Sequence, residues 1–330
     1  MLRIRVLAGV ATLALVAACS SGGDDDDAGD GGGSSGGEAP ASAEFSLLAY
    51  NVAGLPQELS GENPAQNIPL ISPMLNGFDV VLTQEDFDWW GQLAADLDFV
   101  NYHTRLRAEA NHEFVSGAHP GPDAVGLDLS VRPPPEVGDG LGTLSRFPIT
   151  EVARVPWTGC FGGFDTTDGG AGDCLAMKGF SLVTVTLADG VEVDVYNVHG
   201  EAGASLIDQT LQAAGYAQLS AFIAERSEGR AVIVAGDTNL HTDLEHPDGG
   251  AGADIAIWDE FLADTGLTDA CTATGCRSPG RIDKVALRSG DGVDLEALSH
   301  RFLGDRFVDT AGEPLSDHEP LEVRLRWSAA

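Results

Sequence analysis

The stretch from residue 231 to residue 239 constrains this chain more than any other. Residues 231–235 are apolar and largely β-branched, which predicts a buried strand. The strand stops at Gly236 and is followed by the polar side chains of Asp237 and Asn239. Strand ends are rigid and open to solvent, so α/β folds often place their chemistry there. Taken alone, the stretch is also consistent with a plain strand and a Gly-Asp turn.

Other strand-like segments of the chain carry polar side chains at the same kind of position. A histidine that leaves a core strand is a candidate acid or base, because its unperturbed pKa lies near neutrality. The polar residues and their segments are Asn51 after residues 45–50, Glu85 after 79–83, His199 after 191–196, Asp283 within 281–287, and Asp317 with His318 at the start of 315–325. Together these positions indicate one site built from several strand ends.

The N-terminal residues predict export. Arg3 and Arg5 precede an apolar run, residues 6–18, which is too short to span a bilayer but typical of a signal peptide. Small residues directly before Cys19 resemble the lipobox of bacterial lipoproteins. That resemblance implies a membrane-anchored lipoprotein, periplasmic or on the cell surface, with the lipid on Cys19. An ordinary signal peptide with a chance cysteine is the alternative.

Residues 19–43 predict a disordered tether. They are rich in Gly, Ser and Asp and lack apolar periodicity, so they bury too little surface to offset their chain entropy. Residues 44–330 contain no second low-complexity break, which favours one large α/β domain. Within it, residues 180–187 and 191–196 predict a β-hairpin. Helices are predicted over residues 68–75, 205–226 and 255–262.

The chain is strongly acidic. It has 51 acidic and 18 basic residues, a net charge of −33. Six of the acidic and two of the basic residues precede residue 44, so residues 44–330 keep 45 acidic and 16 basic residues, a net charge of −29. Nonspecific affinity for nucleic acid depends on Lys and Arg side chains that neutralise phosphates, so a nucleic-acid partner is disfavoured. The same field favours bound divalent cations.

Four cysteines follow Cys19. In an exported chain an even number favours disulfides, and we predict the two sequence-local pairs Cys160–Cys174 and Cys271–Cys276. A zinc site is the alternative, but neither spacing is a C-x-x-C pair and no histidine follows at ligand distance in the sequence.

The ordered set of polar strand ends resembles one superfamily, the endonuclease/exonuclease/phosphatase or deoxyribonuclease-I-like proteins. The resemblance runs from about residue 46 to residue 326, and its most specific parts are the Gly-Asp-Thr-Asn motif at 236–239 and the Ser-Asp-His motif at 316–318. It implies an α/β fold of four layers, in which two mainly antiparallel sheets pack face to face with helices outside.

The residues also fit phosphodiester chemistry on physical grounds. A phosphodiester is anionic and repels nucleophiles, so a hydrolase must neutralise charge, ionise a water molecule and protonate the leaving oxygen. Mg²⁺ (or Mn²⁺) takes hard oxygen ligands and keeps several waters, so a few carboxylates and amides suffice to hold it. Asn51 and Glu85 fit this role, and Asp317 would complete the metal shell.

The remaining residues of the set have expected catalytic roles. Asp283 would orient His318 and support its charge, as a carboxylate orients histidine in hydrolase triads. Asp237 and Asn239 would position water and phosphate. His199 would bind a phosphate oxygen or assist the leaving group.

Three segments resemble one subfamily, the neutral sphingomyelinases. Residues 173–180 contain a Lys-Gly-Phe sequence like the one whose lysine lies near the site in that subfamily, which makes Lys178 a catalytic candidate. Segments 51–56 and 84–87 are similar to the subfamily's opening motifs. One departure is Lys284, which stands where an aromatic residue is common.

Two adjacent indoles, Trp89 and Trp90, are the best sequence candidates for contact with a membrane. On a helix they could not both face the core, so one is expected to be exposed near the site, with core packing of the pair as the alternative. No apolar hairpin for membrane insertion is evident beyond them.

The leading hypothesis is a metal-dependent phosphodiesterase of phospholipase C type that acts on sphingomyelin or a related lipid headgroup, as a monomer. The alternatives are a secreted nuclease or phosphatase of the same fold, and a non-catalytic surface binding protein on this scaffold.

Overall fold

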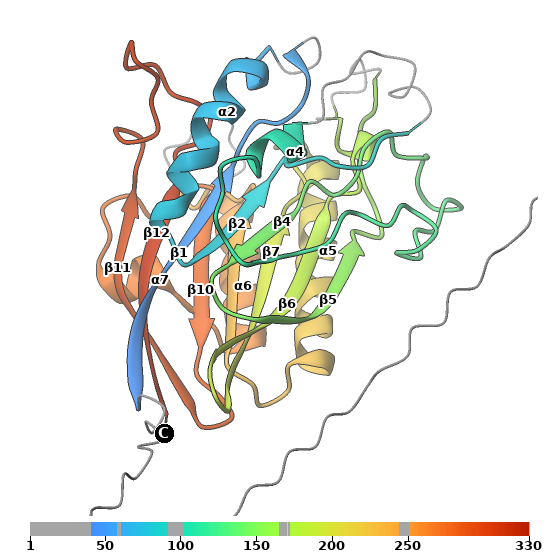
Figure 1. Cartoon of the computed structure of the whole chain (residues 1–330). Helices are drawn as coiled ribbons and strands as arrows, with labels where there is room; N and C mark the ends of the chain where they lie inside the picture. The colour runs from blue at the N-terminus through green and yellow to red at the C-terminus, as the bar shows by residue number, and fades with distance from the viewer. Residues whose placement is uncertain are drawn as a thin grey trace, which may run out of the picture. The chain divides into compact units, whose positions relative to one another are not determined.

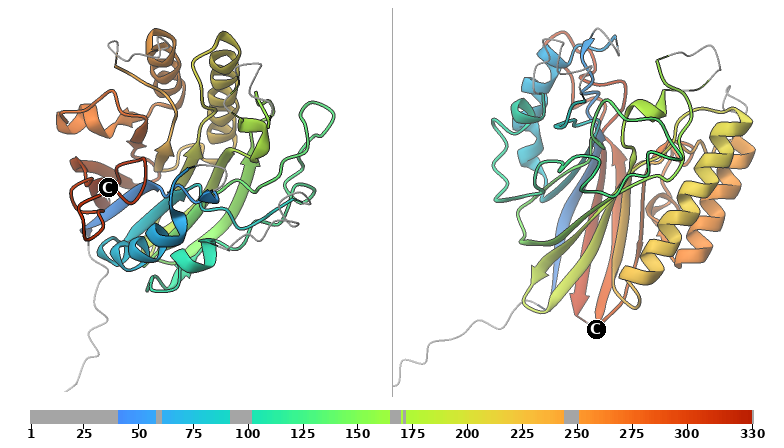
Figure 2. Two further views of the ribbon diagram at one scale, coloured as in Figure 1. Left: turned by 90° about the horizontal axis from the view of Figure 1, so that it is seen from above. Right: turned by 90° about the vertical axis from the view of Figure 1, so that its right-hand side faces the viewer.

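The computed structural model describes residues 41–57, 61–91, 102–164, 170, 172–243 and 251–329. These residues form two six-stranded sheets that pack face to face, with helices on both outer sides (Figure 1 and Figure 2). The predicted four-layer α/β sandwich is therefore confirmed. The predicted signal peptide, Cys19 and nearly all of the predicted tether lie in residues 1–40, outside the described residues.

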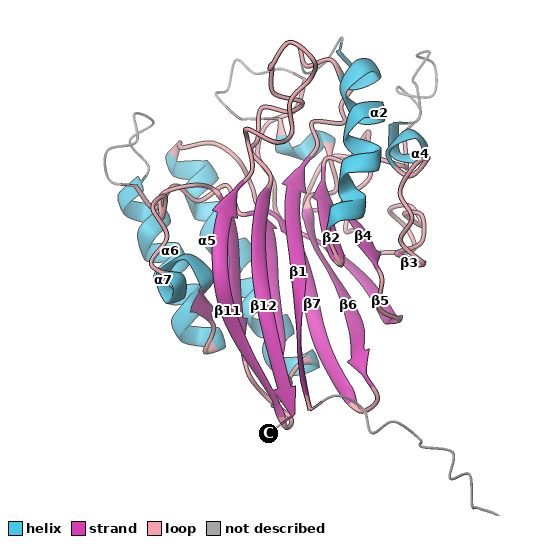
Figure 3. Ribbon diagram, turned by 60° about the vertical axis from the view of Figure 1, so that its left-hand side comes forward, coloured by secondary structure: helices cyan, strands magenta, loops and turns pink. Residues whose placement is uncertain are grey.

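The first sheet has the strand order β11-β12-β1-β2-β4-β3 (Figure 3). Its strands are β1 (Ser42–Asn51), β2 (Val80–Gln84), β3 (Phe114–Val115), β4 (Gly142–Ser145), β11 (Val293–Phe302) and β12 (Leu321–Ala329). Strands β1 and β2 are parallel, and the other pairs are antiparallel. Strand β1 begins two residues before the predicted domain start at residue 44.

The second sheet has the order β5-β6-β7-β8-β10-β9. Its strands are β5 (Ile149–Pro156), β6 (Gly179–Ala188), β7 (Val191–His199), β8 (Val232–Asp237), β9 (Thr268–Asp269) and β10 (Asp283–Arg288). The predicted hairpin is confirmed as β6–β7, and β7 with β8 is the parallel pair of this sheet. Each sheet thus has one parallel pair near its middle.

Helices cover the outer faces of both sheets. Figure 2 shows α5 and α6 packed on the second sheet and α2 on the far side of the first. The helices are α2 (Pro64–Met74), α4 (Tyr102–Leu106), α5 (Leu206–Arg226), α6 (Ala251–Thr265) and α7 (Ala270–Thr274), with 3₁₀ turns η1 (Leu75–Gly77) and η3 (Asp173–Leu175). Within the described part of the chain, no helix has the length and hydropathy to cross a membrane.

The core between the sheets is apolar, but polar contacts cross it near the strand ends. Inward-facing Val, Leu, Ile and Ala side chains of both sheets form a single buried cluster. At the upper end, Gln84 Nε2 donates to Asn197 Oδ1 across the sheets at 2.6 Å. Asn197 Nδ2 in turn donates to the carbonyls of Thr83 and Gly142, each at 3.0 Å. Because a buried amide is costly unless it is paired, these contacts of Asn197 fix how the two sheets meet.

Both predicted disulfides are present, Cys160–Cys174 with 5.1 Å and Cys271–Cys276 with 4.8 Å between Cα atoms. The first closes the Gly-rich loop that precedes β6.

The expectation for the adjacent indoles is not met. Residues 87–91 do not form a helix: the carbonyl of Trp89 accepts from Gly138 N at 2.9 Å, and Trp90 forms an isolated bridge with Val137. Trp90 also packs on Phe87, with 6.3 Å between ring centroids. Backbone pairing with the segment around Val137 holds this stretch at the surface of the domain. Both indoles are therefore half-buried.

Candidate functional site

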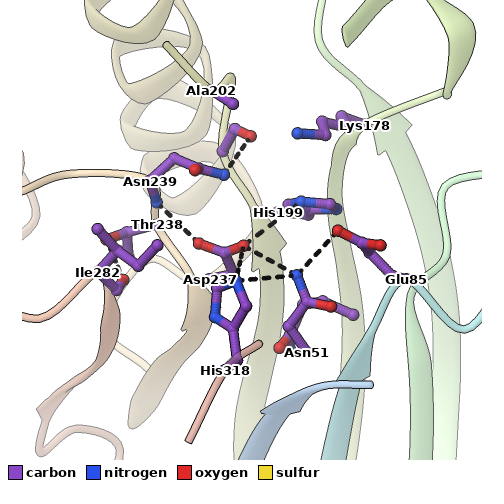
Figure 4. A network of polar contacts seen from close by, with 12 residues as sticks. Asn51, Glu85, Lys178, His199, Ala202, Asp237, Thr238, Asn239, Ile282 and His318 are labelled. Atoms are coloured by element: carbon purple, nitrogen blue, oxygen red, sulfur yellow. Dashed lines mark hydrogen bonds and ion pairs between the residues drawn. The ribbon is translucent and has the colours of Figure 1, made fainter. Parts of the chain in front are cut away.

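The two parallel strand pairs end at the same edge of the sandwich. Asn51 is paired with Gln84 at the ends of β1 and β2, and His199 with Asp237 at the ends of β7 and β8. Strand β10 runs antiparallel to β8 and places its first residue, Asp283, opposite Asp237. The start of β12 lies beside Ala49 of β1, which brings residues 316–318 to the same edge. The sequence-predicted side chains therefore converge, as Figure 4 shows for most of them.

Asn51 stands at the centre of the site. Its amide nitrogen lies 3.1 Å from Glu85 Oε1 and 3.1 Å from Asp237 Oδ2, and 3.5 Å from His318 Nε2. Its Oδ1 accepts from Ala53 N at 3.1 Å, which fixes the orientation of the amide. One buried side chain thus joins carboxylates that come from different sheets.

His318 and Asp283 form a dyad. Nδ1 of His318 lies 3.0 Å and 3.2 Å from the two carboxylate oxygens of Asp283, and Nε2 lies 3.7 Å from Asp237 Oδ2. Burial alone would lower the pKa of His318, but the facing carboxylates of Asp237 and Asp283 raise it to about 10. His318 is therefore held charged with a carboxylate behind it, an arrangement suited to proton transfer.

His199 differs in environment from His318. It is buried, its Nε2 lies 3.5 Å from Asp237 Oδ2, and its backbone carbonyl accepts from Trp157 Nε1 at 2.9 Å. Burial and the nearby Lys178 charge hold the pKa of His199 well below its usual range. The imidazole is thus neutral, and suits hydrogen bonding to a ligand more than proton abstraction.

Backbone strain is concentrated around these side chains. Ala53, Glu85 and Asn239 have positive φ angles of 47°, 55° and 52°, which non-glycine residues seldom adopt. Such conformations persist only where surrounding contacts hold them, and they cluster at functional sites. Gly236 has a φ of 141°, and a Cβ there would lie 2.2 Å from the carbonyl oxygen of Val198, so only glycine fits.

Helix α5 supplies contacts that hold the Asp237–Asn239 segment. Tyr216 donates its hydroxyl to the carbonyl of Thr238 at 2.9 Å, and Gln212 Nε2 donates to the carbonyl of Glu201 at 2.9 Å and of Asn239 at 3.3 Å. Asn239 Nδ2 donates a hydrogen bond to the carbonyl of Gly200 at 3.1 Å. Gln212 and Tyr216 were not predicted from the sequence. Their signal was the presence of polar groups on the buried face of an amphipathic helix.

Lys178 reaches the site from the segment before β6. Its Nζ lies 2.5 Å from Asp173 Oδ1, and Asp173 Oδ2 accepts from Ala202 N at 2.8 Å. Burial would lower the pKa of Lys178, but Asp173, with the charges of Asp237 and Glu85, raises it. Lys178 is therefore a fixed positive charge beside the carboxylates (Figure 4).

Two buried acids near Lys178 were not predicted from the sequence, Asp173 and Glu201. Glu201 Oε1 accepts from Phe161 N at 2.5 Å. Burial, followed by the charge of Asp173, raises the pKa of Glu201 to about 8. Only their contacts in the fold show that these two acids belong to the site.

Asp317 lies at the entrance rather than in the centre. Its side chain is exposed and lines a cavity of about 840 Å³ together with Asp283 and His318. Arg277, Arg281 and Glu319 also line this cavity. The cavity therefore opens directly onto the dyad, with room for a substrate group larger than a phosphate.

The donor set fits a divalent cation. Asp237 and Asp283 bring buried carboxylates to one place and Glu85 adds a half-buried one, and desolvation raises the pKa of Glu85 and Asp283. One oxygen of Asp237 and of Asp283 and a ring nitrogen of His318 all lie within 4.8 Å of one another. An excess of hard oxygen donors in a poorly solvated site is what Mg²⁺-type ions require. A cation bound there would relieve the repulsion among the carboxylates.

Behind Glu85, the buried carboxylate of Asp86 holds that segment to helix α4. It lies 2.7 Å from a guanidinium nitrogen of Arg107, 2.9 Å from His103 Nδ1 and 2.8 Å from Thr83 Oγ1. Burial would raise the pKa of Asp86, but Arg107 and His103 hold it well below its usual range.

We therefore expect Asp86→Asn to lower the free energy of unfolding by about 2–4 kcal/mol, because it removes a fully buried carboxylate from its ion pair with the partly buried guanidinium of Arg107. Urea titrations at pH 7 measure the change. Since a depressed carboxyl pKa stabilises only above the unfolded pKa, the difference between variant and parent should shrink as the pH falls below about 4.

The control is Glu319→Gln, which breaks an exposed ion pair with Arg281 and should cost less than about 1 kcal/mol. Equal losses in the two variants would contradict the role assigned to Asp86.

Sequence comparisons place the chain among known proteins. The model of the Endonuclease/Exonuclease/phosphatase family matches residues 48–318. A sphingomyelinase from Mycobacterium tuberculosis is 32% identical over 305 residues, which cover 87% of this chain and 54% of that protein. The chain thus spans about half the length of the curated relatives it matches.

Solved structures show the same fold. Sphingomyelinase C from Streptomyces griseocarneus aligns with a TM-score of 0.55 at 19% identity, covering 86% of this chain and 99% of that one. A mutant of beta toxin from Staphylococcus aureus, solved with bound magnesium ions, aligns with a TM-score of 0.54 at 17% identity and covers 85% of this chain and 99% of the other. The fold is thus deoxyribonuclease-I-like, and the chain belongs to the endonuclease/exonuclease/phosphatase family.

Proposed function

We propose that this protein is a metal-dependent phosphodiester hydrolase of phospholipase C type that cleaves sphingomyelin or a related lipid headgroup ester. The observation that carries the proposal is the convergence of Asn51, Glu85 and Asp237 on the His318–Asp283 dyad, beside the charge of Lys178. The identity to sphingomyelinases over most of the chain supports the lipid substrate.

Each residue of the site has its own role in the proposed reaction. Lys178 and neutral His199 face the space in front of Asp237 and would hold phosphate oxygens as a point charge and a hydrogen-bond partner. Asp237 lies close to both histidines and would orient the attacking water. His318, charged and backed by Asp283, would give or take a proton at Nε2.

We infer that the cation is Mg²⁺, or Mn²⁺ in its place, held by Glu85 and Asn51 with Asp317 from the entrance. Asn51 would have to present its amide oxygen, which now accepts from Ala53 N, so binding would turn the amide. When bound, such an ion supplies charge neutralisation for the phosphoryl group and acidifies a water molecule. The bound magnesium in the related beta toxin supports this choice of ion.

A substrate panel tests the proposal. Sphingomyelin and phosphatidylcholine in mixed micelles, inositol phosphates and plasmid DNA are incubated with the protein in Mg²⁺, and released headgroup or cut DNA is measured. We expect hydrolysis of the choline lipids, with Asp237→Asn as the inactive control. Cleavage of DNA alone would identify a nuclease, and no turnover of any substrate would favour a binding protein on this scaffold.

A further inference from the structure

Lys284 is a buried cation directly behind the site, and the mechanism does not use it. Its exposed fraction is 4%. Successive side chains of a strand point to opposite faces, so Asp283 faces the site while Lys284 points to the other side of β10, toward helix α6. Its Nζ lies 5.7 Å from the ring centroid of Trp258 on that helix. Lys284 therefore follows a site residue in the chain but belongs to the layer behind the sheet.

The ammonium of Lys284 is paired with oxygens from two separate segments. Nζ donates to Thr242 Oγ1 at 3.0 Å, to the carbonyl of Pro279 at 3.2 Å and to the carbonyl of Arg281 at 2.5 Å. These acceptors use all three N–H donors of an ammonium group. A buried charge is costly unless it is fully paired, so the burial of Lys284 favours the arrangement in which both segments stay in contact with it.

The two segments form one wall of the cavity beside the dyad. Residues 241–243 and 277–281 all line this cavity of about 840 Å³, and we call them the braced wall. They also contact each other, because Thr242 Oγ1 donates to the carbonyl of Pro279 at 2.6 Å. Every residue that Lys284 holds thus has the cavity on its other side. Lys284 supports the wall from behind.

The braced wall lies where a substrate would extend beyond its phosphate. Lys178 and His199, which would hold the phosphate, are not among the lining residues of the cavity, whereas His318 is. In Figure 4, Lys178 and Ile282, the residue that follows the wall, lie on opposite sides of Asp237. An ester group of the substrate that passes His318 would therefore enter the cavity and meet the wall.

We propose that Lys284 is a positioning residue that fixes the braced wall against the part of the substrate beyond the phosphate. This inference rests on the proposed function. It gives a role to the lysine that departs from the sphingomyelinase pattern. Because Lys284 acts through the wall, its loss should weaken the binding of a whole substrate and leave the catalytic centre intact.

Lys284→Met tests the proposal, because it keeps the unbranched side chain and removes the ammonium. Hydrolysis of sphingomyelin in mixed micelles is measured at pH 7 with Mg²⁺, and inorganic phosphate serves as a competitive probe. We expect KM to rise about tenfold and kcat to change by less than about threefold, since the wall binds substrate and transition state alike. The inhibition constant of inorganic phosphate should stay unchanged, because phosphate does not reach the wall.

Thr242→Val removes the same brace from the wall side with little change in volume. It should raise KM as Lys284→Met does, and the double variant should lose little more, because both changes break one contact. This second variant tests the proposal even where Lys284→Met fails to fold.

The matched control is Arg288→Met at the other end of β10. Its guanidinium also donates to backbone carbonyls, those of Ser227, Arg230 and Thr265, which do not line the cavity. We expect this variant to be less stable to heat and to keep the parental KM. An equal rise of KM in Arg288→Met, an unchanged KM in both brace variants, or a parallel rise of the phosphate inhibition constant would each overturn the proposal.

Limited proteolysis tests the brace independently of activity. Trypsin cuts after Arg281 when the wall opens, and the rate follows the population of the open form. We expect cleavage there to be about tenfold faster in Lys284→Met and Thr242→Val than in the parent or Arg288→Met. Faster cleavage without hydrolysis of any phosphodiester would support the brace and overturn the proposed function. Equal cleavage and equal KM, with sphingomyelin hydrolysed, would overturn the brace and keep the hydrolase.

Discussion

Exhaustive chelation is expected to abolish hydrolysis of a soluble chromogenic phosphodiester, and Mg²⁺ or Mn²⁺ to restore it. The carboxylates of Glu85, Asp237 and Asp283 otherwise repel an anionic substrate from the site that must bind it. Charge neutralisation is the largest contribution to phosphoryl transfer, so the rate without cation should fall by several orders of magnitude. The rate is measured after dialysis against EDTA and again after titration with each metal.

Glu85→Gln tests whether the cation is held where we propose. The substitution keeps the shape and the contact with Asn51 but removes a charge, so the metal concentration for half-maximal activity should rise steeply. Thermal unfolding gives an independent readout, because Mg²⁺ should stabilise the parent protein and not the variant. Asp88→Asn, three residues further along the same segment, is the control and should respond like the parent. Full activity after chelation would contradict the mechanism.

His318→Gln is expected to lower kcat by about 10²- to 10⁴-fold with little change in KM, because the proton carried at Nε2 matters in the transition state and not in substrate binding. Asp283→Asn should cost less by itself and add almost nothing to His318→Gln, since the carboxylate acts through the histidine. His300→Gln, a half-buried histidine on β11, is the control.

The same histidine should affect stability in the metal-free protein. A charge whose folded pKa is raised stabilises fully below the unfolded pKa, about 6.5 for histidine, and that contribution is lost as the pH rises through about 10. The His318→Gln variant should lack this alkaline loss of stability in urea titrations. Additive kinetic losses in the double variant, or an unchanged alkaline profile, would contradict the dyad.

The polar strand ends could be predicted because their local pattern is independent of the rest of the fold. Asn51, Glu85 and His199 each follow a short apolar run, and a side chain that leaves a core strand has few directions available. Their meeting in space followed only from the order of motifs that the family shares. The parallel pairs β1–β2 and β7–β8 supply the physical reason, because each pair delivers two strand ends to one edge.

Features that depend on contacts between distant segments could not be predicted from the sequence. Asp173 begins the short 3₁₀ turn η3 and Glu201 lies in the loop after β7, and nothing local distinguishes them from solvated acids until the fold places them beside Lys178. Strand β11 was missed because only Val293 among its ten residues is fully buried, so its hydrophobic alternation is weak. The prediction of an exposed indole on a helix was wrong because the segment around Trp89 pairs with Val137 and Gly138, which are distant in the sequence.

The pairing of the first and last strands determines where the two ends of the described domain lie. Ser42 lies opposite Ser328, so the chain enters and leaves the domain at neighbouring points, at the foot of the sandwich in Figure 1. Strand β1 then runs ten residues to Asn51, about 33 Å at ~3.3 Å per residue. Both ends of the described domain therefore lie at the opposite end of the sandwich from the site residues. A fluorescent label or a surface linker attached at either of these ends would leave the site free.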